Sequence, residues 1–378
     1  MLYFDHNAKA PLSPRARAVW LDAQERYPAN AASLHRLGQR ADRALEEARE
    51  TLAGLLGARA AGLVFTSGAT EAANTVLAHL AQSARTAGEA HPGIWVSAIE
   101  HPCVLEAAER WFPGRVRRLG VDARGVLELG ELSAGAAGGE RPAGVVVMAA
   151  NNETGVLQPW GAVLAWARGR GVPLVCDATQ WVGRLPAEGL GECDFVLGSG
   201  HKCGGPVGTG FLHCGTGGLR PLLVGGAQEE GRRAGTQNVA GSLALVAALE
   251  ECGGRMGEVE ERLGRRERFE AGLRADLGAR ILGEGAERLW NTVLLLPPEL
   301  GDCRQRWVVR LDAAGVAASS GSACASGREE VSHVLEAMGV SRGEAGRALR
   351  LSVGWEGPDW EEAGGRLREI LRKWGGRG

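Results

Sequence analysis

Apolar and polar positions alternate along the first two thirds of the chain in a way that is typical of an α/β protein. Short apolar runs with the length of buried strands recur at residues 64–65, 93–99, 116–119, 144–149, 173–176 and 195–197. Segments with helical spacing occur at residues 14–27, 39–56, 72–81 and 162–168. Because strands that alternate with helices form mostly parallel sheets, the pattern predicts a doubly wound or related α/β sheet. The alanine and glycine run at 134–139 is interpreted as a flexible loop.

The pattern changes after residue 212. A polar, glycine-rich stretch at 225–238 is too long for a simple connector. A long helical region at 242–277, interrupted at Gly253-Gly254, follows it. The remaining strand-like and helical runs alternate, at 291–296, 305–313, 316–318, 350–353 and 359–374. Since 378 residues exceed one ordinary core, we expect a second, smaller α/β domain.

Small and polar residues follow the predicted strands of the first part. Parallel strands end at one edge of a sheet, and ligands bind in the crevice outside these ends. The turn from Ser67 to Glu71 points free backbone N–H groups and a helix dipole toward an anion, although a plain helix cap has the same pattern. His101 suits an acid–base or stacking role, and Asp177 suits a place opposite a protonated ring nitrogen. Each also has a structural interpretation, as a satisfied loop histidine and as a helix cap.

Lysine is scarce in this chain. Lys9, Lys202 and Lys373 are the only ones, and arginine supplies nearly all of the remaining positive charge. Lys202 directly follows the strand-like run at 195–197 and precedes a glycine-rich turn. A desolvated lysine amine can lose its proton and form a Schiff base, which arginine cannot do. This stretch alone leaves open whether Lys202 is such a nucleophile or an ordinary surface-loop lysine.

The composition argues against several classes of function. A formal net charge of -2, with acidic and basic residues intermixed, indicates neither a nucleic-acid-binding surface nor an acidic tail. The N-terminus has no signal-peptide pattern, and no apolar run is long enough to span a bilayer. The 8 cysteines form no C-x-x-C pair, which disfavours a zinc site or a disulfide framework. We therefore expect a cytoplasmic protein with reduced thiols, no metal, and no nucleic-acid or membrane partner.

Taken together, the strand-end motifs resemble those of a known enzyme family. Four stretches carry the resemblance: T-S-G-A-T-E at 66–71, N-N-E-T-G at 151–155, D-A-T-Q at 177–180 and S-G-H-K at 199–202. G-T-Q-N at 235–238 and S-S-G-S-A-C-A-S-G at 319–327 add to it. In this order and spacing, the motifs resemble those of the cysteine desulfurases of the NifS/IscS type, in the class-V pyridoxal-phosphate-dependent aminotransferase family.

The resemblance covers nearly the whole chain and implies the fold-type-I architecture of pyridoxal-phosphate transferases. It implies a large cofactor-binding domain at 15–254. It also implies a smaller domain, formed by 1–14 with 255–378, that carries the loop at 319–327 and a carboxylate-binding arginine. Pyridoxal 5'-phosphate is the implied cofactor, and a homodimer is the implied assembly.

The resemblance also implies cofactor-binding roles for individual residues. Lys202 would hold the cofactor through a Schiff base, Asp177 would pair with the pyridinium nitrogen, and His101 would stack on the ring and move protons. Asn152 and Gln180 would lie near the phenolic oxygen. Further cofactor contacts, mostly to the phosphate, are implied for Ala69, Thr70, Ser199, Gly200, His201 and, from the other subunit, Thr236.

The reaction implied by the resemblance is the removal of sulfur from L-cysteine to give L-alanine. Arg350 and Asn152 would bind the substrate carboxylate, and Cys324 would accept the sulfur as a persulfide. The sulfur would then pass to a protein acceptor, in iron–sulfur cluster assembly or in thiolation. A selenocysteine lyase, another class-V aminotransferase and an inactive sulfur-relay scaffold are the alternatives. Transamination needs no thiol, and an idle scaffold needs neither Lys202 nor Asp177.

The chain departs from the family pattern at positions outside these roles. Lys9-Ala10 stands where threonines are usual, and Cys203-Gly204 replaces bulkier residues after the lysine. Val207, Glu230 and Trp355 replace basic residues that are common in the family. These departures concern the substrate pocket and the partner surfaces.

Overall fold

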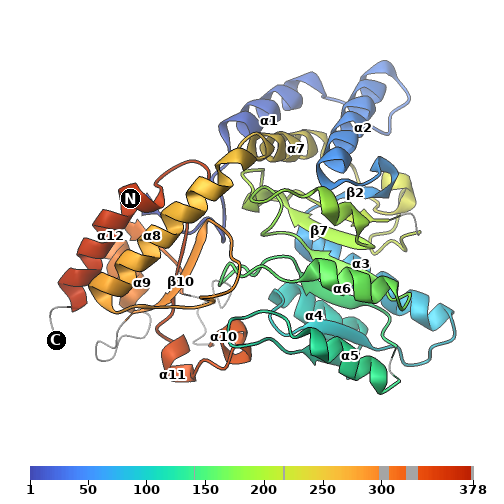
Figure 1. The fold of residues 1–378 in the computed structure, drawn as a ribbon. Coiled ribbons are helices and arrows are strands. Elements are labelled where there is room, and N and C mark those ends of the chain that lie inside the picture. The colour runs from blue at the N-terminus through green and yellow to red at the C-terminus, as the bar shows by residue number, and fades with distance from the viewer. Residues whose placement is uncertain (140, 216–217, 298–305, 321–330, 376–378) are drawn as a thin grey trace.

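The fold is built on a mostly parallel sheet. The computed structural model describes residues 1–139, 141–215, 218–297, 306–320 and 331–375 (Figure 1). Within them, seven strands form one sheet in the order β2-β8-β7-β6-β5-β3-β4, and only β8 is antiparallel to its neighbours. The strands are β2 (Leu63–Thr66), β3 (Ile94–Ser97), β4 (Val116–Leu119), β5 (Val145–Met148), β6 (Leu174–Asp177), β7 (Phe195–Ser199) and β8 (Gly210–Cys214). The predicted α/β sheet is confirmed.

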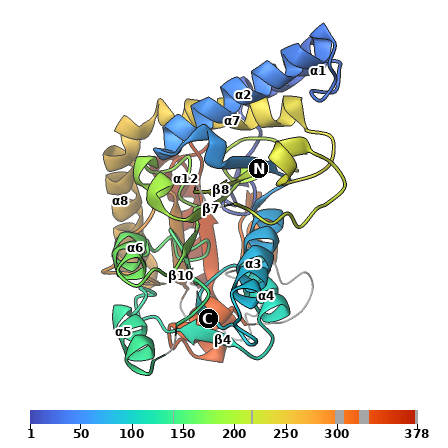
Figure 2. The same cartoon turned by 90° about the vertical axis from the view of Figure 1, so that its right-hand side faces the viewer.

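Helices cover both faces of this sheet, as Figure 2 shows. α3 (Ala69–Thr86) and α4 (Pro102–Trp111) lie on one face, and α5 (Leu129–Ala137) and α6 (Trp160–Arg168) lie on the other. Successive residues of a strand point to opposite faces, so β5 contributes Val146 to the first core, and Val145 and Val147 to the second. Burial on both faces explains why these strands are continuous apolar runs in the sequence.

Three further helices pack beyond the β2 edge of the sheet. α1 (Pro14–Arg26) and α2 (Arg36–Leu56) both pack on α7 (Val239–Gly253) (Figure 1). Small side chains, Ala16, Ala244 and Ala248, form the buried contact between α1 and α7. These alanines allow the two helices to pack closely, beside the segment that leads from the N-terminus to α1.

The C-terminal part forms a second, smaller sheet. β10 (Thr292–Leu296) pairs antiparallel with β9 (Arg280–Ile281) and β12 (Leu349–Ser352), while β1 (Leu2–Tyr3) pairs with β11 (Val316–Ala317). The N-terminal strand therefore lies with the C-terminal part of the chain. The accompanying helices are α8 (Val259–Leu277), α9 (Arg306–Ala313), α10 (His333–Ala337), α11 (Arg342–Ala345) and α12 (Trp360–Gly375). The predicted domain boundaries at 14–15 and 254–255 stay a prediction.

One expectation about local structure is wrong. The run at 134–139 is not a loop throughout, because α5 continues to Ala137. Gly135 lies against the ring of Trp95, and a Cβ at this glycine would stand 2.4 Å from the ring. The glycine therefore permits a close helix-to-sheet approach, and the neighbouring alanines are good helix formers.

Candidate functional site

A cavity of about 630 Å³ opens at the carboxyl ends of the parallel strands. Its lining comes from the β2–α3 turn, from the ends of β3, β5, β6 and β7, and from β12. Ten of the residues singled out in the sequence line it together: Ala69, Thr70, His101, Asn152, Asp177, Gln180, Ser199, His201, Lys202 and Arg350. The structure therefore places residues from six separate stretches of the sequence around one space of ligand size.

Three of the predicted residues are not part of this lining. Gly200 is buried in the turn behind the cavity, where its N–H donates to the carbonyl of Thr209 at 2.9 Å. Thr236 is exposed and does not line the cavity of its own chain. Cys324 lies outside the described residues.

Lys202 lies in the turn that follows β7, with its amine at the cavity. Its Nζ donates to the backbone carbonyls of Asn7 at 2.7 Å and Ala8 at 2.8 Å. Both contacts are to backbone carbonyls, so they orient the amine through neutral acceptors. The amine is therefore positioned by the N-terminal segment of the chain.

Asp177 is the last residue of β6 and is nearly buried. Its Oδ1 accepts the N–H of Thr179 at 2.9 Å. The neighbouring carboxyl, Glu100, is fully buried and accepts the N–H of Met148 at 2.6 Å. Burial in the first place, and the charge of Asp177 in the second, raise the pKa of Glu100 well above its usual value. Burial thus favours the neutral, protonated form of Glu100 beside the Asp177 side chain that faces the cavity.

The opposite wall suits an anion. α3 begins at Ala69, so its first backbone N–H groups and the positive end of its dipole face the cavity. Ser199 Oγ and His201 Nδ1 lie 2.9 Å apart on the same wall, and burial lowers the pKa of His201 to about 4. A Cβ on Gly210 would stand 2.5 Å from Gly68 Cα, so the two glycines permit the close approach of β8 to this turn.

His101 caps the first turn of α4. Its Nδ1 accepts the N–H of Cys103 at 3.2 Å, which leaves Nε2 to carry the proton of the neutral ring. Burial lowers the pKa of His101, the charge of Asp177 opposes this, and Lys202 and His333 add to the lowering. The histidine is thus a neutral imidazole near neutral pH.

Arg350 crosses from β12 into the cavity and is only 1% exposed. Its Nη2 pairs with Asp5 Oδ1 at 2.7 Å, and its Nη1 donates to the carbonyl of Asn152 at 3.0 Å. Its Nε is buried and makes no hydrogen bond within the described part of the chain. The guanidinium is therefore held in place on one edge while one donor is still unsatisfied.

The sequence analysis missed the residue that connects these groups, Asn7. Its Nδ2 donates to Thr292 Oγ1 at 2.8 Å and to the Asn152 carbonyl at 3.1 Å. Its own carbonyl accepts from Lys202 Nζ and from Gln180 Nε2. The sequence signal that could have identified Asn7 is the polar turn that follows β1. The other lining residues are Ala8, Ser67, Gly68, Glu71, Cys103, Met148, Ala150, Thr179, Val207 and Gly208, mostly close sequence neighbours of predicted ones.

Comparison with known proteins agrees with this site. The family model described as aminotransferase class-V matches residues 2–356. A cysteine desulfurase of Frankia sp. is 38% identical over 375 residues, covering 94% of this chain and 87% of the relative. One of Gluconacetobacter diazotrophicus is 37% identical over 366 residues, covering 95% and 90%. A solved NifS-like protein aligns over 98% of both chains with a TM-score of 0.87 and 30% identity.

The chain therefore belongs to the class-V aminotransferase family, whose enzymes depend on pyridoxal 5'-phosphate. Its curated relatives are cysteine desulfurases, so the resemblance to the NifS/IscS type and the fold-type-I architecture are confirmed. The cavity fits the cofactor, because a lysine amine, a buried carboxylate and an anion-binding helix end face one space. In addition, Gln180 Oε1 on its lining is buried without a hydrogen-bond partner among the described residues.

Proposed function

We propose that this protein is a pyridoxal-phosphate-dependent cysteine desulfurase. It removes sulfur from L-cysteine, releases L-alanine and carries the sulfur as a persulfide on Cys324. The observation that supports this most is the convergence of Lys202, Asp177, His101 and Arg350 on one cavity. A lysine, a carboxylate, an imidazole and a guanidinium are the groups that this chemistry requires.

The residues around the cavity divide the binding of the cofactor among them. The bound cofactor supplies an electron sink that stabilises negative charge at the substrate Cα. Lys202 is its covalent anchor, and Asp177 keeps a proton on the ring nitrogen. The start of α3, with Thr70, Ser199 and His201, binds the phosphate. Asn152 and Gln180 line the same cavity, and in this proposal they would contact the phenolic oxygen.

Arg350 and His101 act on the substrate. The guanidinium of Arg350 keeps donors for the substrate carboxylate while Asp5 and the Asn152 carbonyl fix its plane. His101, neutral and protonated at Nε2, stacks on the cofactor ring and moves a proton. The lowered pKa of His101 favours the uncharged imidazole.

Cys324 is the sulfur acceptor in this proposal, and the described residues on either side of it support the assignment. Ser319 pairs with Arg350 through two backbone hydrogen bonds, of 2.7 and 3.2 Å. Ser332 Oγ donates to Glu153 Oε2 at 2.6 Å, next to Asn152. Both flanks of the segment that carries Cys324 are therefore attached beside the cavity lining.

The proposal extends to the assembly and the acceptor. The stretch at 225–238 is connected to the start of α3, where the phosphate would bind. Arg233 pairs with Glu71 at 2.9 Å, and Glu71 accepts the N–H of Ser67. Thr236 is exposed on the same stretch, so it is accessible to a second copy of the chain. We propose a cytoplasmic homodimer in which Thr236 contacts the partner's cofactor phosphate. A protein of iron–sulfur assembly or of thiolation takes the sulfur. No described helix is long and apolar enough to span a membrane.

The purified protein tests this proposal directly. With L-cysteine and a thiol reductant, it should produce L-alanine and sulfide in equal amounts and change the visible absorbance of the cofactor. Cys324→Ala should keep the absorbance change but release no sulfide, with Cys193→Ala, a buried thiol away from the cavity, as control. No alanine from the wild type, or normal sulfide release by Cys324→Ala, would contradict the assigned chemistry.

A further inference from the structure

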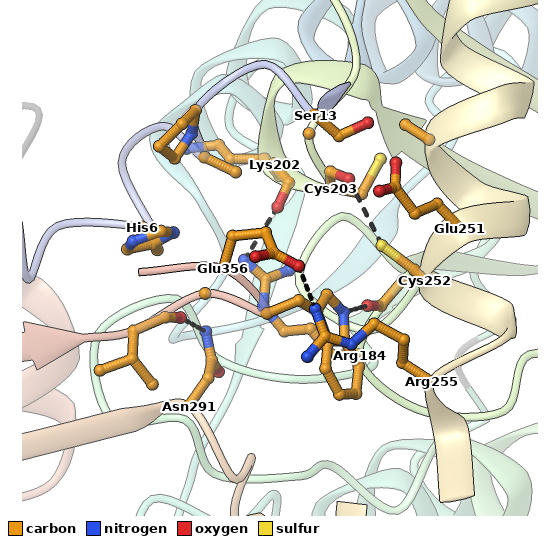
Figure 3. Close-up of a pocket in the computed structure, with 18 of the residues that line it drawn as sticks. His6, Ser13, Arg184, Lys202, Cys203, Glu251, Cys252, Arg255, Asn291 and Glu356 are labelled. Carbon is orange, nitrogen blue, oxygen red and sulfur yellow. Dashed lines mark hydrogen bonds and ion pairs between the residues drawn. The ribbon is translucent and has the colours of Figure 1, made fainter. Parts of the chain in front are cut away.

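A second, smaller cavity of about 90 Å³ lies behind Lys202 (Figure 3). Lys202 lines both cavities, and the walls of the second come from residues 10–14, from α7 and from 353–356. A single water needs roughly 10–15 Å³ on a comparable measure, so this space holds a molecule of several heavy atoms. None of the roles assigned above uses it.

One wall carries a buried cation without a counter-ion. Arg184 is 4% exposed, and among the described residues no carboxylate lies within ion-pair distance of it. Its guanidinium donates to the carbonyls of Gln180 at 3.3 Å and Lys202 at 3.1 Å, and to Asn7 Oδ1 at 3.5 Å. Burial lowers the pKa of Arg184 to about 10, so the charge persists at neutral pH and stays unpaired.

Another wall carries an unpaired carboxylate. Glu251 lines the cavity from α7, and its Oε2 is buried without a hydrogen-bond partner in the described part of the chain. Arg255, the other arginine on the lining, already pairs with Glu258 at 2.9 Å and with Glu356 at 2.5 Å. The cavity lining therefore carries one positive group, Arg184, and one negative group, Glu251, that are not paired with each other.

The remaining walls are apolar or weakly polar. Cys203 and Cys252 also line the cavity, and burial raises the pKa of their thiols to about 11 and about 12. The thiols are therefore neutral and do not supply the anion that Arg184 lacks. Trp290, Trp355 and Leu12 complete a wall that fits a small apolar or sulfur-containing side chain.

We propose that this cavity binds a small α-amino acid as a zwitterion. Its carboxylate pairs with Arg184, its ammonium pairs with Glu251, and its side chain lies against Cys203 and Cys252. A zwitterion satisfies both buried charges without adding net charge, which neither water nor a simple anion does. The choice of L-alanine as the ligand rests on the proposed function, which makes this amino acid the product. Arg184 also donates to the carbonyl of Lys202, the residue that anchors the cofactor. The side chain of Arg184 therefore connects the bound amino acid to Lys202.

Equilibrium dialysis of the holoenzyme with labelled L-alanine tests the site. The visible absorbance of the cofactor reports alanine at the first cavity, while the bound label counts all alanine. We expect label in excess of the absorbance change, by one further molecule per chain. Glu251→Gln keeps the shape of the side chain and removes its charge, and it should weaken only this second class of binding, by about tenfold or more.

Glu250→Gln is the matched control. Glu250 is the preceding residue of α7, pairs with Arg15 at 2.6 Å and does not line the cavity, so its variant should bind as the wild type does. Equal effects of the two variants, or no label beyond the absorbance change, would overturn the proposal. L-lactate, which lacks the ammonium group, should not displace the second alanine, and equal displacement would identify a simple anion site instead. Sulfide release from L-cysteine is measured separately, so failure of the second site is distinct from failure of the proposed function.

Discussion

At the residue scale, backbone carbonyls help to orient the charged side chains of the site. Lys202 is fixed by two backbone carbonyls, and Arg350 by Asp5 and one carbonyl. Such contacts orient the amine of Lys202 and the guanidinium of Arg350 at the cavity. Substitutions at this scale should therefore change binding or titration more than folding.

Lys202→Arg should abolish covalent retention of the cofactor. Arginine keeps the positive charge but stays protonated, so it cannot anchor a carbonyl cofactor. After reduction with borohydride and denaturation in acid, the wild type should retain the cofactor on the chain and the variant should lose it. Lys9→Arg, at an exposed lysine, should behave as the wild type. Cofactor retained covalently by Lys202→Arg would contradict the assignment.

Glu153→Gln should increase stability at alkaline pH. Burial raises the pKa of Glu153 from 4.5 to about 7, while the Ser332 hydroxyl and Arg350 oppose the shift. Protonated Glu153 therefore stabilises the fold fully below pH 4.5, and this stabilisation is lost as the pH rises to about 7. The advantage of glutamine should grow between pH 5.5 and 8, by about 2 kcal/mol in the free energy of unfolding.

Urea unfolding at both pH values measures this difference. Glu336→Gln, at a partly exposed carboxylate paired with Arg342, is the control and should show no comparable pH trend. An advantage that is equal at the two pH values would show that the titration of Glu153 does not contribute.

At the element scale, the stretch at 225–238 is tied to the sheet by a buried ion pair. Glu229 accepts two hydrogen bonds from Arg49 of α2, at 2.6 and 3.0 Å, and one from the N–H of Phe65 on β2. Its backbone is left-handed, with φ of 50°, a conformation that costs a non-glycine residue energy. The pair attaches the stretch to α2 and β2 of the same chain.

Glu229→Gln should destabilise the protein by about 3–5 kcal/mol, because it removes the buried charge partner of Arg49 and leaves only the exposed Glu46 paired with this guanidinium. Glu230→Gln is a close control, since Glu230 is also left-handed but exposed, and it reaches Arg232 only at 3.4 Å. That control should change stability by less than about 1 kcal/mol. Chemical denaturation of the two variants side by side checks the prediction, and similar losses would assign the effect to the backbone instead.

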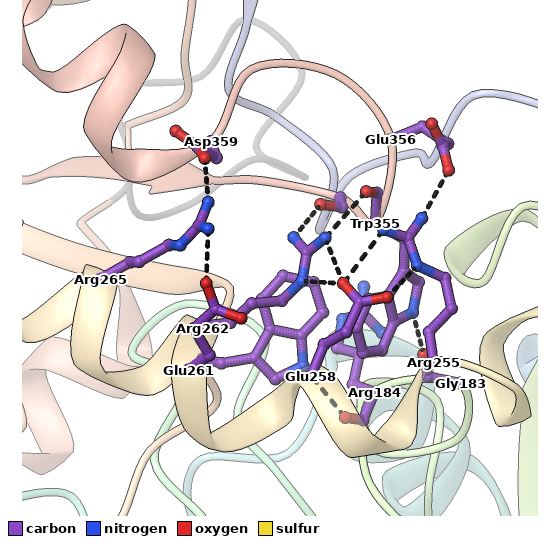
Figure 4. A network of polar contacts seen from close by, with 12 residues as sticks. Gly183, Arg184, Arg255, Glu258, Glu261, Arg262, Arg265, Trp355, Glu356 and Asp359 are labelled. Carbon is purple, nitrogen blue, oxygen red and sulfur yellow. Dashed lines mark hydrogen bonds and ion pairs between the residues drawn. The ribbon is translucent and has the colours of Figure 1, made fainter.

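At the scale of the whole molecule, a cluster of arginine and tryptophan joins the two sheets (Figure 4). Trp355 donates from Nε1 to the Gly183 carbonyl at 2.7 Å and packs against Trp290, with ring centroids 4.4 Å apart. Arg255 and Arg262 lie over its ring, 5.3 and 4.9 Å from the centroid. Trp355 thus forms a packed contact between α8, the C-terminal sheet and the turn that follows β6.

Trp355→Ala should destabilise the protein by about 3–5 kcal/mol, because a large aromatic side chain and its two cation–π contacts are lost together. Thermal or urea unfolding measures the loss. Trp20→Ala is the control, since Trp20 is 37% exposed and lies outside this cluster. A small change at Trp355 would show that the two sheets are held together by other contacts.

Thr236→Val should weaken cofactor binding if the homodimer forms as proposed. A hydrogen bond to a charged phosphate contributes about 1.5–3 kcal/mol, so its loss raises the cofactor dissociation constant about tenfold to a hundredfold. Titration of the apoprotein with pyridoxal phosphate, with sedimentation at several concentrations, measures affinity and assembly. Thr51→Val, on α2 and away from the cavity, is the control. Unchanged affinity would return Thr236 to an ordinary surface position.

The sequence by itself determined the sheet, the family and ten of the residues that line the site. The apolar runs specify which segments become parallel strands, and parallel strands bring their carboxyl ends together whatever the details of packing. Residues placed directly after those runs, such as Asp177, His101 and Lys202, therefore converge without further information. Local pattern was insufficient at 134–139, where contact with Trp95 accommodates a glycine within a helix.

The tertiary structure decided the pairings between residues far apart in the chain. Asn7 lies between Lys202, Gln180 and Thr292, Arg350 pairs with Asp5, and Glu229 pairs with Arg49. No periodicity encodes such contacts, because each joins segments that only the tertiary fold brings together. The unpaired charges of Arg184 and Glu251 are likewise apparent only in three dimensions, because a missing partner is a property of the surroundings and not of the residue.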